Sequence, residues 1–330
     1  MWIASAPLRV SLVGGGSDYP EHFNVNGGAT FGFAISSRTY VTAIKIDPVI
    51  SGHNFKISYR DIEEVAEIKA IKHEPFRIAL ENQGLNPGWE FSVSADLPAY
   101  TGLGSSSSFL VALIGLLGQV QNKSYTPSEI AVLAFETERV GLKQFVGMQD
   151  QIMAAYGGVC YLEFGGANNF KVTQSDKSNL GFIEKDCALV STGTKRRAAE
   201  IVKDIAKNSK NNSGEMARLA DLARATNDLY ENGNLDNYAL AEIVNIGWEL
   251  KKKLSNLTSN SAIENQMEFL RSKGAIGMKL LGAGGGGFIF TIFPAGKKEE
   301  ICRELPGMNI KNVLISESGL QILNSEESRV

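Results

Sequence analysis

A run of two glycines and four serines is the part of the sequence best suited to bind phosphate. Gly102, Gly104 and Ser105–Ser108 stand directly before an apolar stretch at 109–117, which predicts a helix. The glycines allow a ligand to approach the backbone closely, and the first amides of the helix would donate hydrogen bonds to an anion. Residues 98–108 therefore predict a loop that binds the phosphates of a nucleotide.

Two further glycine clusters, at 14–16 and 282–287, also follow apolar segments. The second matches the GxGxxG pattern of dinucleotide-binding turns, but a strand-like run at 288–293 stands where that fold requires a helix. A Walker A loop is absent, because the only Gly-Lys pair, at 296–297, precedes another lysine and lacks the upstream glycine. No HRD or DFG element follows the serine-rich loop, so the protein-kinase pattern is excluded as well.

Taken together, the three clusters resemble the motifs of the GHMP small-molecule kinases, a family that includes galactokinase, homoserine kinase and mevalonate kinase. The second family motif reads Pro, three residues, then Gly-Leu-Gly-Ser-Ser, and Pro98 with residues 102–106 matches it. Serines at 107–108 replace the two alanines that are usual there. The first motif matches 9–18 and the third matches 279–287, so the resemblance spans nearly the whole chain.

This resemblance implies an α+β protein with the two-lobed GHMP kinase fold. Residues 1–175 are expected to form an N-terminal domain similar to ribosomal protein S5, and residues 176–330 a C-terminal ferredoxin-like α/β domain. Periodicity predicts strands at 8–13, 38–44, 54–59, 90–95, 159–164, 187–191 and 288–293. It predicts helices at 62–83, 106–121, from 127, and at 195–208, 214–232, 236–255 and 260–273, followed by helix, strand and strand within 297–323.

ATP is the phosphate donor that the resemblance implies, together with Mg²⁺. The expected ATP-binding residues are those of the second motif: Pro98, Gly102, Leu103, Gly104, Ser105, Ser106, Ser107 and Ser108. Ser106 is also the expected hydroxyl ligand of Mg²⁺. Helical phase leaves Glu136 and Glu138 equally open as the carboxylate ligand. Mevalonate kinases carry a similar Phe-Glu-x-Glu-Arg segment whose second glutamate binds the metal, which favours Glu138.

The resemblance also assigns the residues that bind the acceptor. Asp150 matches the aspartate of a Gly-x-x-Asp element that faces the acceptor hydroxyl and is expected to act as the base. Asp18 matches an aspartate that accepts hydrogen bonds from sugar hydroxyls, the alternative being a cap on the turn before Pro20. The other residues expected to frame the substrate are Arg9, Gly15, Gly16, Ser17, Gly284 and Gly285.

The first motif narrows the range of possible acceptors, because residues 8–18 are similar to those of D-glycero-D-manno-heptose 7-phosphate kinases. Three cations at 195–197 open a predicted helix, where they oppose the helix dipole and therefore suggest an anionic partner. Heptose kinases carry a similar Thr-Gly-x-x-Arg-x-Ala segment, and Arg196 matches its arginine. The implied reaction is phosphorylation of the anomeric hydroxyl, giving a heptose 1,7-bisphosphate for nucleotide-heptose and surface polysaccharide synthesis.

Three alternatives stay open at this point. The enzyme could instead be another sugar 1-kinase, of the fucose or galactose type. It could be a sensor of the same fold that binds ATP and sugar without transfer, although retention of the metal and base residues argues against this. The cations around Arg196 could also form an ordinary solvated helix start.

Composition sets the remaining expectations. A net charge of -3 and a pI near 5.8 argue against a nucleic-acid partner. The three cysteines are far apart and odd in number, which favours reduced thiols and a cytoplasmic location. No signal-like start is present, and the apolar stretch at 109–120 is too short to cross a bilayer, so no membrane partner is expected. A homodimer is compatible with this sequence.

Overall fold

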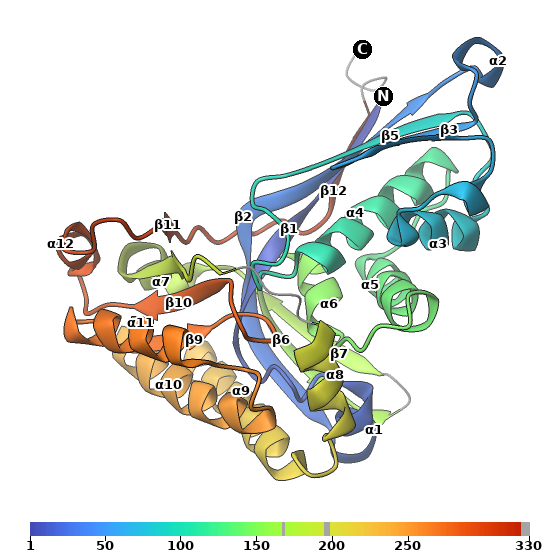
Figure 1. Cartoon of the computed structure of the whole chain (residues 1–330). Helices are drawn as coiled ribbons and strands as arrows, with labels where there is room; N and C mark the ends of the chain where they lie inside the picture. The colour runs from blue at the N-terminus through green and yellow to red at the C-terminus, as the bar shows by residue number, and fades with distance from the viewer. Residues whose placement is uncertain (167–168, 195–198, 325–330) are drawn as a thin grey trace.

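The computed structural model describes residues 1–166, 169–194 and 199–324 of the chain. Two sheets, one of eight strands and one of four, define the two lobes seen in Figure 1. Helices flank both sheets, so the predicted α+β class and two-lobed organisation are confirmed.

The N-terminal lobe is built on the eight-stranded sheet. Its strand order is β12-β1-β2-β5-β3-β4, with β6 paired to β2 and β7 paired to β6. Only β3 and β5 run parallel; the other pairs in this sheet are antiparallel. The strands are β1 (Trp2–Val13), β2 (Gly28–Lys45), β3 (Phe55–Ser58), β4 (Ile62–Val65), β5 (Trp89–Ala95), β6 (Val159–Phe164), β7 (Phe170–Ser175) and β12 (Gln321–Asn324).

Three helices of this lobe, α3, α5 and α6, pack around α4, which carries the serine-rich loop at its N-terminus. The apolar run 109–117 makes α4 hydrophobic on all sides, and the helix is accordingly buried between β1, β2, α3, α5 and α6. The helices are α1 (Pro20–Asn26), α2 (Pro48–Ser51), α3 (Glu74–Gln83), α4 (Ser105–Val120), α5 (Pro127–Glu136) and α6 (Gln149–Tyr156), with a 3-10 turn η1 (Ile68–Ala70) and a π-helical turn η2 (Thr137–Gly141).

The C-terminal lobe places its helices against an antiparallel sheet of order β11-β8-β10-β9. Its strands are β8 (Cys187–Ser191), β9 (Gly277–Leu280), β10 (Phe288–Ile292) and β11 (Ile310–Asn312). Its helices are α7 (Gly181–Asp186), α8 (Ala199–Lys207), α9 (Ser213–Glu231), α10 (Asn237–Leu254), α11 (Ser261–Ser272) and α12 (Lys298–Arg303), preceded by a 3-10 turn η4 (Ser178–Leu180).

A β-bulge in the pairing of β1 with β2 turns the first strand from one core to another. The register shifts between Pro7 and Leu8. Ala4 and Ala6 belong to the core that contains α4, whereas Leu8 belongs to a second core that includes residues of α9 and α10. Bulges re-aim the side chains that follow them, and here the bulge leaves Arg9 facing the helices of the N-terminal lobe.

Most predicted elements are confirmed, but the expected helix at 62–83 is wrong at its start. Residues 62–65 form β4, which pairs with β3, and the helix begins only at Glu74. The carboxylate of Glu63 accepts hydrogen bonds from the backbone amides of Lys72 and His73, at 2.6 and 3.0 Å. This contact folds the segment between strand and helix into a turn, which short-range periodicity could not reveal. Of the predicted helix at 195–208, residues 195–198 lie outside the described residues.

The end of the chain crosses back into the N-terminal lobe. β12 pairs antiparallel with β1, although it lies within the range expected for the C-terminal domain. The buried guanidinium of Arg38 secures this segment by donating to the carbonyls of Ser5, Ser318 and Gly319. The division at residue 175 remains a prediction, with β12 structurally part of the first lobe.

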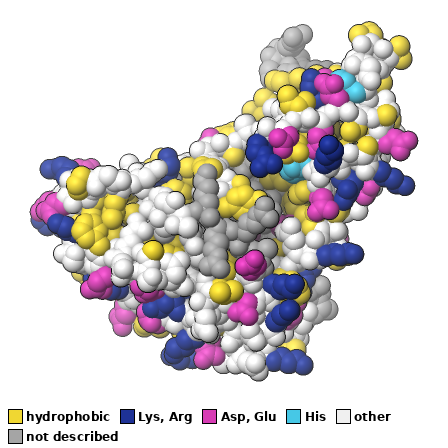
Figure 2. Space-filling model, viewed as in Figure 1, with side chains coloured by type: hydrophobic (Ala, Val, Ile, Leu, Met, Phe, Trp, Pro, Cys, Tyr) yellow, Lys and Arg dark blue, Asp and Glu magenta, His cyan; other side chains and the backbone are white. Residues whose placement is uncertain are grey.

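Surface charge is mixed on the face shown in Figure 2, where basic and acidic side chains alternate. Exposed apolar side chains gather at the tip of the N-terminal lobe, where Val49 and Ile50 of α2 are 91% and 86% exposed. No helix within the described ranges is both long enough and apolar enough to span a bilayer.

Replacing Arg38 tests how strongly it secures β12. Arg38→Met removes a buried donor group and leaves several backbone carbonyls without partners, so the free energy of unfolding should fall by about 2–5 kcal/mol. Urea denaturation measures this change. Arg60, whose side chain is 88% exposed and pairs with neighbouring Asp61, is the control, and Arg60→Met should leave the midpoint unchanged. Equal midpoints for both variants would contradict the assigned role.

Candidate active site

The serine-rich loop and the N-terminus of α4 form a site of the kind that binds anions. Gly102 and Gly104 have φ of 79° and 76°, a left-handed conformation that glycine adopts without strain. The first intrahelical hydrogen bond of α4 runs from the amide of Ser108 to the carbonyl of Gly104, at 2.9 Å. The amides of residues 105–107 therefore precede the helical ladder and point along its positive end.

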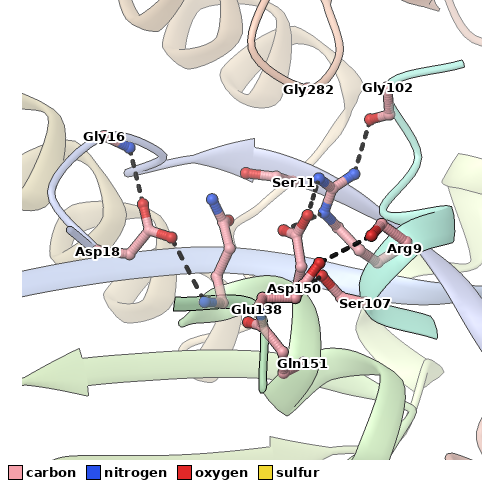
Figure 3. Close-up of polar contacts among 12 residues, drawn as sticks. Arg9, Ser11, Gly16, Asp18, Gly102, Ser107, Glu138, Asp150, Gln151 and Gly282 are labelled. Atoms are coloured by element: carbon pink, nitrogen blue, oxygen red, sulfur yellow. Dashed lines mark hydrogen bonds and ion pairs between the residues drawn. The ribbon is translucent and has the colours of Figure 1, made fainter. Parts of the chain in front are cut away.

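Arg9 and Asp150 form a bidentate ion pair beside this loop (Figure 3). Nε and Nη2 of Arg9 donate to Oδ1 and Oδ2 of Asp150 at 2.7 and 2.6 Å. Nη1 donates to the carbonyl of Gly102 at 2.7 Å. The arginine side chain is only 5% exposed and that of Asp150 is 23% exposed, so one carboxylate remains reachable while its orientation is fixed.

Glu138 lies next to the loop as a buried carboxylate. Its Oε1 accepts a hydrogen bond from the hydroxyl of Ser106, and its Oε2 from that of Ser107, both at 2.8 Å. The side-chain amide of Gln151 also donates to Oε2 (Figure 3). Burial raises the pKa of Glu138, a shift that these donors oppose and that nearby Asp150 reinforces. Removal from water at only 1% exposure makes this carboxylate a strong ligand for a cation.

A π-helical turn explains why Glu138 and not Glu136 faces the site. The amide of Leu142 bonds to the carbonyl of Thr137 across the wider π spacing. Glu138 is buried in this turn, whereas Glu136, at the end of α5, is exposed. Arg139 braces the turn through an ion pair with Glu21 of α1. π-bulges are frequent at functional sites, and regular helical phase could not separate the two glutamates.

Asp18, in the loop after β1, joins Asp150 and Glu138 as a carboxylate of the site. Its Oδ1 accepts from the amide of Gly16 at 2.9 Å and its Oδ2 from the amide of Gln149 at 3.4 Å (Figure 3). Tyr19, not Asp18, is the N-cap of α1, and the bond from Gly16 shows that Asp18 also braces the turn before Pro20. Burial raises the pKa of Asp18, and its largest opposing influence is the hydrogen bond from Gly16.

In the first glycine loop, Gly15 lies at the site, whereas Gly16 and Ser17 pack against core residues. Gly15 lies near the side chain of Gln149, since a Cβ there would meet its amide nitrogen at 3.1 Å, and Gly16 lies against Leu254 of α10. Ser17 is fully buried, and its hydroxyl is hydrogen-bonded to backbone groups of the turn and of β2. The side chain of Ser17 therefore holds the loop in place and does not face a ligand.

The third glycine cluster packs backbone to backbone against the phosphate loop. A Cβ at Gly282 would lie 2.6 Å from Cα of Gly102, and one at Gly287 would lie 2.4 Å from the carbonyl oxygen of Thr101. The amide of Phe288 donates to that same carbonyl at 3.1 Å. Glycine is required here because the two lobes meet with no room for side chains.

Gly284 and Gly285 of the third cluster contact Thr258 and not the phosphate loop. The amide of Gly285 bonds to the carbonyl of Thr258 at 2.9 Å, and a Cβ at Gly284 would clash with the same residue. Thr194 contacts the next glycines, since the amide of Gly287 donates to its carbonyl at 3.0 Å. Arg196, two residues beyond Thr194, lies outside the described residues.

The remaining loop residues have mixed environments. Leu103 is fully buried in the core, and Pro98 is exposed at the entrance to the loop. Ser105 is partly buried at the first position of α4, while the hydroxyl of Ser108 is turned away and donates to the carbonyl of Ala6. The hydroxyls that face the carboxylates are therefore those of the middle two serines.

Two site residues have no counterpart in the sequence-based assignment. Gln151 bonds to Glu138, and Lys251 of α10 reaches the third glycine cluster by donating to the carbonyl of Gly282. Lys251 could have been noticed from its spacing, because it follows the apolar residues Val244 and Trp248 at helical intervals. A lysine on the buried stripe of a helix needs a specific partner.

This arrangement supplies the parts of phosphoryl transfer. It combines a helix N-terminus, which favours anions, with the partly exposed carboxylate of Asp150 and the buried carboxylate of Glu138. No cluster of three His, Cys, Asp or Glu side chains suited to a metal occurs among the described residues.

The fold and these side chains define a phosphotransferase with an alcohol group as acceptor. Models of the GHMP kinase N-terminal domain and of the GHMP kinase C-terminal domain match residues 68–158 and 214–311, more than half of the chain. The chain belongs to the GHMP kinase family, and the resemblance identified from its motifs is confirmed.

Named relatives match almost the full length of the chain. A D-glycero-alpha-D-manno-heptose 7-phosphate kinase from Campylobacter jejuni subsp. jejuni serotype O:2 is 28% identical over 315 residues, covering 91% of each chain. A mevalonate kinase from Pyrococcus abyssi is 27% identical over 345 residues, covering 97% of each. A solved D-glycero-D-manno-heptose 1-phosphate kinase from Bacteroides thetaiotaomicron superposes with a TM-score of 0.80 at 22% identity, over 98% of this chain and 99% of that one. The superposition establishes the shared fold.

Adding a methyl group at Gly147 tests the position of Asp18. A Cβ there would lie 1.9 Å from Oδ2 of Asp18, so Gly147→Ala must displace the carboxylate. A displacement of about 1 Å is expected to lower kcat/KM for the alcohol substrate by about 10²-fold, with a smaller effect on KM for the phosphate donor. Steady-state kinetics measure both. Gly214→Ala, where no atom lies within 4 Å, is the control, and equal kinetics in the two variants would rule out this role for Asp18.

Proposed function

We propose that this protein is an ATP-dependent, Mg²⁺-requiring sugar kinase that phosphorylates the anomeric hydroxyl of D-glycero-D-manno-heptose 7-phosphate. The observation that carries the proposal is the bidentate Arg9–Asp150 pair, which presents an oriented carboxylate next to the N-terminus of α4. The product is the 1,7-bisphosphate, a precursor for nucleotide-heptose and surface polysaccharide in the cytoplasm.

The donor side of the mechanism uses α4 and Glu138. The amides of residues 105–107 and the glycine turn bind the triphosphate of ATP. Glu138 and the hydroxyl of Ser106 fit a hard divalent cation, because a buried carboxylate lies 2.8 Å from a hydroxyl that is exposed to an incoming ligand. When held there, Mg²⁺ would supply positive charge that offsets the charge of the phosphates during transfer.

The acceptor side uses Asp18 and Asp150. The carboxylate of Asp18 accepts hydrogen bonds from sugar hydroxyls, since carboxylates offer several acceptor sites to a polyol. Asp150 orients the reacting hydroxyl and accepts its proton, while Arg9 holds both carboxylate oxygens in place. Positioning of the acceptor in line with the phosphoryl group supplies most of the catalysis in this type of reaction.

Two observations support a heptose 7-phosphate as the acceptor. The full-length relative from Campylobacter jejuni is named for that substrate. The basic residues 195–197 follow directly on Thr194, whose carbonyl accepts a hydrogen bond from Gly287 of the third glycine cluster. We assign Arg196 to the 7-phosphate, because an arginine fork binds phosphate oxygens through two parallel hydrogen bonds.

A panel of acceptors tests the substrate. ADP release is measured with ATP and heptose 7-phosphate, unphosphorylated heptose, fucose, galactose or mevalonate, and the phosphorylated product is identified by phosphorus NMR. We expect turnover to be highest with heptose 7-phosphate. Preference for fucose or galactose would instead identify another sugar 1-kinase. Binding of ATP and sugar without ADP release from any acceptor would identify a sensor.

The role of Arg196 is tested in the same assay. Arg196→Ala should raise KM for heptose 7-phosphate by about 10- to 100-fold, because charge-assisted hydrogen bonds to the phosphate are lost. KM for ATP, and KM for unphosphorylated heptose, should change little. Equal increases for ATP and the sugar phosphate would remove this assignment.

Asp150→Asn tests the proposed base. The substitution keeps the size of the side chain but removes its capacity to take a proton, so kcat should fall by about 10²- to 10⁴-fold. Rapid-quench turnover and ATP binding are measured together, and ATP affinity should be retained. Asp221→Asn, at an exposed carboxylate paired with Arg224, should leave kcat unchanged. A nearly normal kcat in Asp150→Asn would leave Asp150 without a role as base.

A further inference from the structure

Helix α10 brings a buried lysine from the C-terminal lobe to the place where the third glycine cluster packs against the phosphate loop. Lys251 is 8% exposed, and its Nζ donates to the carbonyl of Gly282. Gly282 lies against Gly102, whose own carbonyl accepts from Arg9. Lys251 is thereby connected to the backbone of both glycine clusters and, through them, to the Arg9–Asp150 pair.

The charged groups that act on Lys251 come from four other segments of the chain. Arg9 of β1 and Lys279 of β9 repel its charge, and Asp18 and Asp150 attract it. On its own helix, the neighbouring Lys252 is paired instead with Glu249 at 2.8 Å and with Glu264 of α11 at 3.3 Å. The carboxylates that attract Lys251 are thus those assigned to the acceptor.

Two other buried cations near Lys251 are already committed to protein groups. Arg9 uses Nε, Nη1 and Nη2 on Asp150 and Gly102. Lys279 is buried and donates to the carbonyls of Ser11 and Leu12 at 2.9 and 2.7 Å. An ammonium group has three N–H donors, and the bond to Gly282 uses one of those on Lys251. Within the described part of the chain, Lys251 is the site cation best able to serve a ligand.

We propose that Lys251 is a catalytic residue whose ammonium group binds the acceptor oxygen and the phosphoryl group as they join. The proposal rests on the function proposed above for the same site. The acceptor O–H bond breaks and its proton passes to the carboxylate of Asp150. The acceptor oxygen bonds to the γ-phosphorus, the bond from that phosphorus to the bridging β,γ-oxygen breaks, and ADP leaves. Lys251 stabilises the negative charge on the oxygens during this exchange.

The ionisation of Lys251 gives this role a pH signature. Burial, reinforced by the charge of Arg9, lowers the pKa of Lys251 to about 8, although Asp18 and Asp150 oppose the shift. The ammonium form that the reaction needs is therefore lost as pH rises through about 8. The free enzyme titrates in kcat/KM, so kcat/KM should decline on the alkaline side of that value.

Two substitutions separate charge from hydrogen bonding. Lys251→Met removes both the charge and the donor to Gly282, whereas Lys251→Gln keeps a donor without the charge. We expect kcat to fall by about 10²- to 10³-fold in both variants, the usual cost of losing one stabilising donor at a developing anion. The alkaline decline near pH 8 should disappear in both. Lys252→Met is the matched control on the same helix and should keep wild-type kcat and pH dependence.

Folding does not confound this experiment. Because the pKa of Lys251 is lower in the folded chain than its usual 10.5, the buried charge costs stability below about pH 8, and the cost disappears as pH rises towards 10.5. Lys251→Met escapes this cost but leaves the carbonyl of Gly282 without its donor, so Lys251→Gln, which keeps a donor, is the variant expected to unfold at or above the wild-type temperature at pH 7. A large loss of kcat in a variant of undiminished stability supports the catalytic role.

The result that overturns the proposal is equally specific. Wild-type kcat in Lys251→Gln would mean that Lys251 only holds Gly282. Persistence of the alkaline decline in either variant would assign that titration to another group. The kinetics are measured with whichever alcohol the wild type phosphorylates fastest, so a failure of heptose 7-phosphate as substrate appears in the wild type and does not affect the comparison of variants.

Discussion

The ion pair between Arg9 and Asp150 is the contact on which the rest of the site depends. One guanidinium fixes both oxygens of the carboxylate and, through its remaining nitrogen, the carbonyl of Gly102. The side chain of Arg9 thus connects strand β1 to helix α6 and to the phosphate loop. A lysine could not replace this arginine, because only a planar fork binds two oxygens and a third acceptor in fixed directions.

Around this ion pair the chain keeps charged groups in an environment that disfavours charge. Burial raises the pKa of Glu138 and Asp18 and lowers that of Lys251 and Lys279. Such groups are stabilised when opposite charge arrives, and the ligands proposed here bring it: a metal ion to the carboxylates, and phosphoryl oxygens to the ammonium. Ligand binding and charge compensation are therefore a single event in this site.

The sequence predicted what local pattern and motif order encode. The glycine and serine spacing at 102–108 indicated the start of α4, and the order of the three motifs indicated the family. What the sequence could not predict depends on contacts distant along the chain. The bonds that Glu63 accepts from Lys72 and His73 convert an apparent helix into a strand and turn. The π spacing at Thr137 decides between two glutamates that regular helical phase treats alike, and Lys251 acquires its surroundings only when the lobes meet.

The return of β12 to the edge of β1 also affects how the protein is made. During synthesis, β1 leaves the ribosome more than three hundred residues before β12, one of its two partner strands. Until then the edge of β1 has unpaired backbone groups, which is a hazard for pairing with other chains. The N-terminal lobe is therefore complete only after the C-terminal lobe has been synthesised. The two halves of this kinase cannot be separated at a simple boundary in its gene.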